Sequence, residues 1–359
     1  MDLATHLLAG VLGAALVAWT LFSATQTFVL PRSANDKLAR IVFRNIRRTF
    51  DFFARRLPTY AQRDHLMALY SPVSLLLLLS FWLTLVLLGF MGIFWALGVP
   101  TWHQAFLLSG SSLLTLGFAS TSGLLLIIAS FGEAAIGLIL VALLIAYLPT
   151  IYSAFSRRES LVTLLEVRAG SPPSAIEMFR RFHRLNRMEK LDELWDQWEL
   201  WFVDVEQTHT SLGALAFFRS PQPDRSWITA AGTILDAAAL YNAALDARRN
   251  VQTDLSIRAG YLALQHIAEY FKIPFDPHPT PDGPISVTRA EFDDALDRLA
   301  ADGIPLKPDR ERAWRDFHGW RVNYDVPLIR LAVLTMAPEA PWSSDEPRHK
   351  IALDLRVKR

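Results

Sequence analysis

Three long apolar stretches dominate the first half of the chain. They cover residues 3–30, 69–98 and 124–155, and each exceeds the roughly 20 residues that a helix needs to cross a bilayer. After residue 157, apolar residues recur every three to four positions and are separated by turns that contain proline or glycine, and the first helix of this region is expected at about 158–169, separate from the stretch that ends at 155. The pattern therefore predicts an all-α membrane protein with a helical C-terminal domain.

Charge separates these two regions clearly. The 359 residues have a mean hydropathy of +0.22 and a net charge of +1, but between Leu66 and Ser156 the only formally charged side chain is Glu133. From Arg157 onward, 27 Lys and Arg stand against 30 Asp and Glu, a balance that does not indicate nucleic-acid binding. The absence of cysteine excludes disulfides, thiol catalysis and cysteine-ligated zinc.

A basic segment, residues 32–66, separates the first two apolar stretches. Short loops this basic remain in the cytoplasm, and Arg157 and Arg158 after the third apolar stretch give the same signal. We therefore expect a multi-pass protein of the cell inner (plasma) membrane, with the N-terminus outside and the C-terminal domain cytoplasmic. No Lys or Arg precedes Arg32, which favours a retained transmembrane helix over a cleaved signal peptide at the N-terminus. The basic residues of the segment are Arg32, Lys37, Arg40, Arg44, Arg47, Arg48, Arg55, Arg56 and Arg63.

Apolar residues recur at helical spacing opposite these arginines. Two interpretations follow: an amphipathic helix along the inner leaflet, or a linker helix docked on the soluble domain. The apolar residues are Leu38, Ile41, Val42, Ile46, Phe50 and Phe53. The chain thus divides into an N-terminal transmembrane helix (1–31), a basic cytoplasmic amphipathic segment (32–66), a membrane module (67–156) and a cytoplasmic α-helical domain (157–359).

Between the second and third apolar stretches lies a segment that is too short to cross the bilayer again. It is rich in hydroxyl groups and ends at Gly123. Non-helical backbone at membrane depth is tolerated only where it is buried in protein or lines water, which predicts a pore loop. The competing interpretation is a hydroxyl-rich hairpin that merely joins two helices.

The sequence Ser112-Leu-Leu-Thr-Leu-Gly-Phe-Ala119 resembles the signature of the potassium-channel pore-loop superfamily, which reads Thr-x-x-Thr-x-Gly-Tyr-Gly followed by Asp. Glu133-Ala-Ala-Ile-Gly137 is similar to the Glu-x-x-x-Gly of inner helices in many bacterial two-helix channels. The resemblance covers residues 69–158. It implies an outer helix, a pore helix at about 101–114, a filter and an inner helix, assembled as a homotetramer that conducts monovalent cations, potassium in particular, without a cofactor.

In such a filter, a ring of backbone carbonyls replaces the water shell of the cation. Gly117 suits the unusual backbone angles that turn the carbonyls inward. Ala119 replaces the second glycine of the family pattern, and in a left-handed conformation it would cost about 1–2 kcal/mol. Ser120 replaces the Asp that follows the family pattern. These two differences affect the outermost ion site, so the inner ion sites are still expected, and selectivity for potassium over sodium stays open. The residues that would form the filter are Thr115, Leu116, Gly117, Phe118 and Ala119.

Four further residues have predicted roles around the filter. Ser112 and Glu133 would support the pore, with Glu133 an anchor for the filter or, alternatively, an ion ligand. Gly137 would hinge the inner helix or permit close packing. Pro149 would bend the helix near its cytoplasmic end and shape the gate.

The C-terminal domain offers no recognisable chemistry. It lacks Gly-x-Gly-x-x-Gly after a strand, an all-β pattern, and any triad of nucleophile, base and orienter, so we predict no enzyme and no catalytic residue. Tryptophans at 195, 198 and 201 form an aromatic stripe along a predicted helix, and such a stripe favours the domain core or a subunit interface over a ligand site. No metal is assigned to His266, Glu269, Asp276 and His278.

Two local patterns in the same domain have alternatives of their own. The loop Arg219–Arg225 favours an ordinary capped helix start over an anion site. Ser174 with Glu177, and Thr288 with Glu291, predict capping boxes. For the whole chain, the alternative function is a non-conducting, membrane-anchored signalling or scaffold protein that acts through its helical domain.

Overall fold

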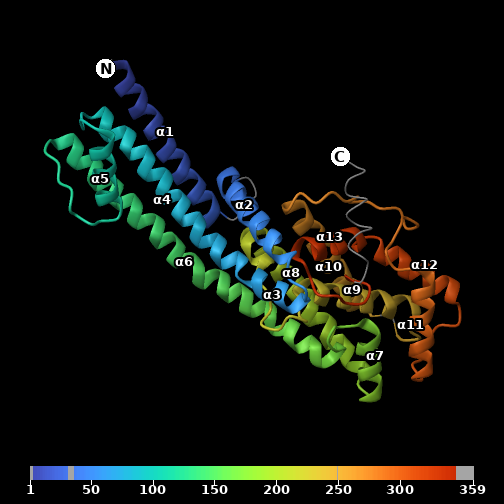
Figure 1. The fold of residues 1–359 in the computed structure, drawn as a ribbon. Coiled ribbons are helices and arrows are strands. Elements are labelled where there is room, and N and C mark those ends of the chain that lie inside the picture. The colour runs from blue at the N-terminus through green and yellow to red at the C-terminus, as the bar shows by residue number, and fades with distance from the viewer. Residues whose placement is uncertain (1–2, 31–35, 249, 345–359) are drawn as a thin grey trace. The chain divides into compact units, whose positions relative to one another are not determined.

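The computed structural model describes residues 3–30, 36–248 and 250–344, and within them the fold is all-helical, without a β-strand (Figure 1). Three helical segments are long and apolar enough to span a membrane: Leu3–Phe28, Tyr60–Ala96 and Leu124–Ala169. The prediction of an all-α membrane protein is therefore confirmed at this level. Arg32 and the ends of the predicted domains, at residues 1–2, 31 and 345–359, lie outside the described residues.

The chain divides into two compact units. The first contains the described parts of residues 1–57 and 69–153, and the second contains those of 58–68 and 154–359. Helix α6, Leu124–Ala169, contributes to both units, and the structure has one continuous helix where the sequence predicted separate helices at 124–155 and 158–169. That prediction of a break was wrong, since the paired arginines after Ser156 are compatible with helix.

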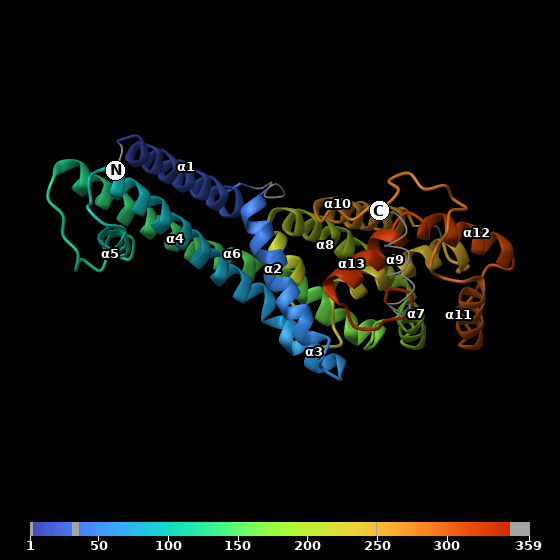
Figure 2. The ribbon, with the colours of Figure 1, turned by 45° about the horizontal axis from the view of Figure 1, so that its top comes forward.

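In the first unit, α1 (Leu3–Phe28) lies beside α4 (Tyr70–Ala96) in both views (Figures 1 and 2). Glycines line the contact. A Cβ at Gly13 would meet the carbonyl oxygen of Gly89 at 2.3 Å, and one at Gly92 would meet that of Ala9 at 2.7 Å. Small residues therefore allow the two backbones to approach closely, as in packed membrane helices.

A buried polar chain joins the end of α1 to the start of α2, Lys37–Ala54. The Ser23 hydroxyl donates to Asp36 Oδ2 at 2.7 Å and accepts from the Trp82 indole at 3.1 Å. Asp36 in turn caps α2 by accepting from the Leu38 backbone N–H at 2.9 Å. One carboxylate thus satisfies an orphan donor of α2 and a hydroxyl of α1.

Helix α2 has one buried and one open side. Leu38 and Ala39 are buried, whereas Ile41 and Phe53 are each 51% exposed, so the predicted apolar face is only partly covered by the first unit. Both interpretations of the basic segment remain compatible with this arrangement. The following helix α3, Tyr60–Ala68, belongs to the second unit.

The second unit is built around a tryptophan-rich core. Trp195, Trp198 and Trp201 of α8 (Leu191–Ser211) are buried in the main hydrophobic cluster, together with residues of α9 (Trp227–Ala244). This confirms that the aromatic stripe is core. The remaining elements are α7, Ala175–Arg184; η2, Met188–Lys190; η3, Gly213–Phe217; α10, Val251–Tyr270; α11, Arg289–Ala301; α12, Arg310–Arg321; and α13, Asp325–Thr335.

Arg321, at the end of α12, is fully buried among acceptors. It forms ion pairs with Asp236 and Asp325, and its guanidinium donates to the carbonyl of Trp342. Burial raises the pKa of Asp236 to about 6, while Arg321 and a hydrogen bond from Tyr324 act in the opposite direction. Burial by itself would lower the pKa of Arg321, but the two carboxylates raise it, so the guanidinium stays charged.

The two predicted capping boxes have different outcomes. Thr288 and Glu291 form the reciprocal pair at the start of α11, as predicted. Ser174 makes no side-chain cap to α7, so that prediction was wrong; Glu177 instead forms ion pairs with Arg180 and Arg181. Two arginines one turn away compete for the carboxylate that the box requires.

Candidate functional site

Helix α5, Trp102–Leu113, and the loop after it form the candidate site. Thr101 caps the helix by accepting from the Gln104 backbone N–H at 3.2 Å. Its 12 residues extend about 18 Å at 1.5 Å per residue, well short of the roughly 30 Å hydrocarbon core. Both views show α5 beside the end of α4 and the start of α6, with the loop at the same end (Figures 1 and 2). The helix lies within the range predicted for a pore helix.

Glu133 of α6 is fully buried and bonds to α5. The Ser109 hydroxyl lies within hydrogen-bonding distance of both Glu133 Oε1 and the carbonyl oxygen of Leu87 in α4, the latter at 3.1 Å. Ser109 therefore connects three helices at one point. Glu133 contacts the short helix rather than the loop itself, and its Oε2 has no hydrogen-bond partner in the described part of the chain.

The loop backbone alternates in conformation. Thr115 has φ +56° and Gly117 has φ +73°, while Leu116, Phe118 and Ala119 do not have positive φ. The left-handed strain expected at Ala119 thus falls on Thr115 instead. Such a conformation is uncommon for a residue with a Cβ.

Serine side chains and carbonyls of α5 hold the start of this loop. The backbone N–H groups of Thr115 and Leu116 donate to the carbonyls of Ser112 and Ser111, at 3.0 and 2.8 Å. The hydroxyl of Ser111 accepts from the Ala119 N–H at 3.1 Å. Ser112, predicted as the supporting residue, contributes a carbonyl, whereas the supporting hydroxyl comes from the residue before it.

The hydroxyl of Thr115 donates to the carbonyl of Leu114 at 2.8 Å, and the side chains of Leu116 and Phe118 are 61% and 62% exposed. Gly117 has open space around the position of an added Cβ. Of the five residues predicted as filter, Thr115 to Phe118 are therefore exposed, whereas Ala119 is half-buried and packs against the hydrophobic cluster of the first unit.

Gly137 lies one turn beyond Glu133, against the last turn of α5. A Cβ there would meet the Leu113 carbonyl oxygen at 2.3 Å. Close packing is therefore a sufficient reason for this glycine. Pro149 lies three turns further along the same helix, which continues through it, and is not part of this group.

In the second unit, the groups considered for metal binding do not converge. His266 pairs with Glu206 at 2.7 Å, and the described residues contain no group of three or more metal-ligating side chains.

Both arginines of the loop before α9 are engaged. Arg219 pairs with Asp64 of α3 at 2.5 Å, and Arg225 pairs with Glu166 of α6. Ser226 caps α9 through the Ile228 N–H at 3.4 Å. The loop is an ordinary capped helix start, as the sequence favoured.

Arg158 was predicted only as a charge that marks the cytoplasmic side, and in the structure it is fully buried. It pairs with Glu159 at 2.8 Å and donates to the carbonyls of Leu215 and Phe218 at 3.0 and 2.7 Å. Its fourth contact is His209 Nε2, at 3.2 Å. Burial, and then the charge of Arg158, lower the pKa of His209 well below 6.5, so this imidazole accepts the bond in its neutral form. The sequence gives no sign of this burial, because Arg158 follows Arg157 directly and both resemble surface arginines.

Comparisons of the chain with family models, with curated proteins and with solved structures found no match.

Proposed function

We propose that the chain is one subunit of a homotetrameric membrane channel for monovalent cations, with potassium as the ion that the loop resemblance implies. In this proposal the chain is not an enzyme and needs no cofactor. The observation that carries the proposal is the loop Thr115–Ala119, whose alternating backbone is held by serines at the end of a helix too short to span a membrane.

The first argument concerns the surroundings of the loop, which must be water or protein rather than lipid. Thr115 to Ser120 are non-helical, yet they lie between two helices that are long enough to span a bilayer. Lipid cannot satisfy exposed peptide groups, so such a backbone must line water or lie against protein. A water-filled axis between subunits meets this requirement.

The second argument concerns carbonyl direction. Left-handed residues at positions 115 and 117, separated by Leu116, support the alternation that points successive carbonyls to one side. The alternation ends before Ala119, which agrees with a filter that keeps its inner sites and lacks the outermost one. Cation conduction is therefore the firmer part of the proposal, and selectivity among cations depends on Ala119 and Ser120.

The third argument concerns assembly. In a single chain the side chains of Leu116 and Phe118 are more than 60% exposed, next to a polar loop. Neighbouring copies around a fourfold axis would cover these apolar groups and complete a ring of carbonyls. Glu133, through Ser109, would fix the height of each pore helix; it acts as an anchor rather than as an ion ligand.

The topology follows from the basic segment and from α1. We place the N-terminus outside and the C-terminal helices in the cytoplasm, because arginines between the first two spans and after the third favour the inner side. The glycine contact between Gly13 and Gly89, and the hydrogen bond between His6 and the Trp95 carbonyl at 3.0 Å, support a retained α1.

The deciding experiment is cation flux through liposomes that contain the purified full chain. We expect flux from the wild type and its loss in Gly117→Asp, because in the proposed tetramer the substitution adds four carboxylates beside the ring of carbonyls, where they would hold the cation too tightly to let it pass. Ser120→Asp is the matched control: it adds the same carboxylate at the position where the family pattern carries one, and it should retain flux.

Equal flux from wild type and Gly117→Asp would show that this loop is not the filter. A monomer or dimer without a central pathway would favour the scaffold alternative. For selectivity, Ala119→Gly should move the reversal potential toward that of potassium under opposed potassium and sodium gradients.

A further inference from the structure

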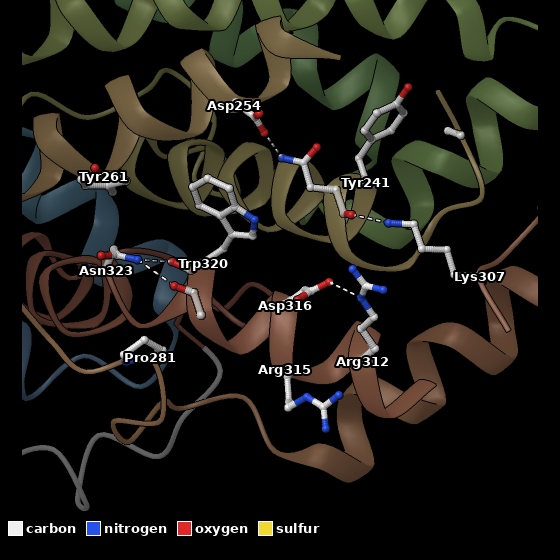
Figure 3. Close-up of a pocket in the computed structure, with 13 residues that line it drawn as sticks. Tyr241, Asp254, Tyr261, Pro281, Lys307, Arg312, Arg315, Asp316, Trp320 and Asn323 are labelled. Carbon is white, nitrogen blue, oxygen red and sulfur yellow. Dashed lines mark hydrogen bonds and ion pairs between the residues drawn. The ribbon is translucent and has the colours of Figure 1, made fainter. Parts of the chain in front are cut away.

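A groove of about 620 Å³ opens in the second unit, between α9, α10 and α12 (Figure 3). Its volume falls within the range of small-molecule sites, roughly 300–1,000 Å³. It is lined by Tyr241, Asn242, Ala247, Asp254, Tyr261, Pro281, Lys307, Arg312, Arg315, Asp316, Gly319, Trp320 and Asn323.

Three cations in this groove have unused hydrogen-bonding capacity. Lys307 donates one bond, to the Asn242 carbonyl at 2.6 Å, and an ammonium carries three N–H groups. Arg312 reaches Asp316 only at 3.8 Å through Nε. Arg315 is exposed and makes no ion pair or hydrogen bond with the described residues. The groove therefore offers donors to an anion.

Two of the side chains that line the groove are acidic. Asp254 accepts from the Asn242 side chain at 2.9 Å, and Asp316 lies 3.8 Å from Arg312. Three cationic side chains against two carboxylates leave the lining with a net positive charge. An anionic ligand would thus be favoured over a cationic one.

An aromatic side chain lies beside the cations. Figure 3 shows the half-buried indole of Trp320 in the middle of the groove, with Lys307 and Arg312 to one side of it. A flat ring stacked on the indole could direct an attached phosphate toward the side of the groove where Lys307 and Arg312 lie. Arginine suits phosphate, because its planar fork can donate two parallel bonds.

The groove walls are held in place without a ligand. His318 Nδ1 bonds to the carbonyl of Pro281 at 2.7 Å, which fixes the proline-rich loop against α12. Asn323 donates to the Gly319 carbonyl at 2.8 Å, and the buried ion pairs of Arg321 fix the end of the helix. A preformed site loses less conformational entropy on binding.

We propose that this groove binds a small organic phosphate, with its planar ring on Trp320 and its phosphate on Lys307, Arg312 and Arg315. Inorganic phosphate alone would need neither a groove of this size nor an aromatic wall, which favours a phosphate that carries a ring. The inference concerns only the C-terminal unit and is independent of whether the chain conducts ions.

The test is isothermal titration of the detergent-solubilised full chain with four ring-bearing phosphates: adenosine triphosphate, guanosine triphosphate, flavin mononucleotide and pyridoxal phosphate. We expect at least one to bind at least about tenfold more tightly than inorganic phosphate or ribose 5-phosphate. If none does, or if adenosine or riboflavin without phosphate binds equally well, the proposal is overturned.

Variants then locate the site. Arg315→Gln and Trp320→Leu should each weaken the binding about tenfold or more, since each removes one of the two recognition elements. The matched control is Arg258→Gln on the exposed side of α10, outside the groove, which should bind like the wild type. Because Arg315 is exposed and has no ion pair or hydrogen bond with the described part of the chain, its variant should fold normally, and unchanged affinity in that variant would refute the assignment.

Discussion

Gly137 lies where α6 crosses the last turn of α5, and its replacement by alanine separates two explanations of this glycine. If Gly137 is a hinge, a methyl group would change how the helix bends but would not disturb the contact with α5. If it permits close packing, the methyl would collide with the backbone of Leu113.

The size of the collision follows from the structure. The added Cβ would lie 2.3 Å from the Leu113 carbonyl oxygen and 3.1 Å from its Cδ1, whereas ordinary contact begins at 3.4 Å. The oxygen or the helix must therefore move by about 1.1 Å. Overpacking of this kind typically costs about 1–3 kcal/mol. Alanine also favours the helix over glycine by about 1 kcal/mol, which partly hides that cost.

Gly132→Ala on the same helix removes this ambiguity, because a Cβ there has nothing within 4 Å. Both variants gain the same helix propensity, so the difference between them, about 1–3 kcal/mol, is the cost of packing alone. Thermal unfolding of the purified full chain in detergent measures it, and cation flux through liposomes, if the proposed function holds, shows whether a displacement of α5 changes that flux. A melting temperature for Gly137→Ala equal to or above that of Gly132→Ala would refute the packing explanation.

Two predictions concern the second unit. Burial lowers the pKa of His209 well below 6.5, so the stabilising contribution of the neutral imidazole is present above pH 6.5 and is lost as the pH falls. His209→Gln should therefore reduce the dependence of the unfolding free energy on pH in the acid range by up to about 1.4 kcal/mol per pH unit. An unchanged slope of unfolding free energy against pH would contradict this prediction. Arg321→Met leaves Asp236 and Asp325 buried without a cation, and it should lower the free energy of unfolding by about 3–5 kcal/mol in a thermal-unfolding measurement. Arg298→Met, which removes an exposed ion pair, should lower it by less than about 1 kcal/mol. A loss for Arg321→Met as small as that for Arg298→Met would show that the buried pairs contribute little.

Local features were predictable from local sequence. The start of α5 follows from Pro100 and the capping Thr101, and the box at Thr288 follows from Glu291 three residues on. The same rule failed at Ser174, because nearby arginines took the glutamate. A cap pattern is therefore reliable only where no stronger partner for its carboxylate lies within a turn.

The candidate site was predictable only in part. The loop residues 115–119 and the presence of one carboxylate in α6 could be read from the chain, but the partner of Glu133 could not. Ser109 and Ser111 stand among several similar hydroxyl residues, and nothing local distinguishes the one that faces α6 from the one that bonds the loop. Their roles depend on the rotation of α5 against α4 and α6.

The three apolar helices, the short helix between two of them and the helical character of the C-terminal part can be predicted from the chain alone, because hydrophobic runs and their periodicity act within a few turns. Which polar groups are buried depends on the packing of segments that are distant in the sequence. Arg158 and Arg321 resemble surface arginines in the sequence, yet both are enclosed by acceptors from distant segments. Their pairing requires residues tens of positions apart to meet, and so does the contact of Gly137 with Leu113, which places α6 against the last turn of α5, just before the loop that would form the filter.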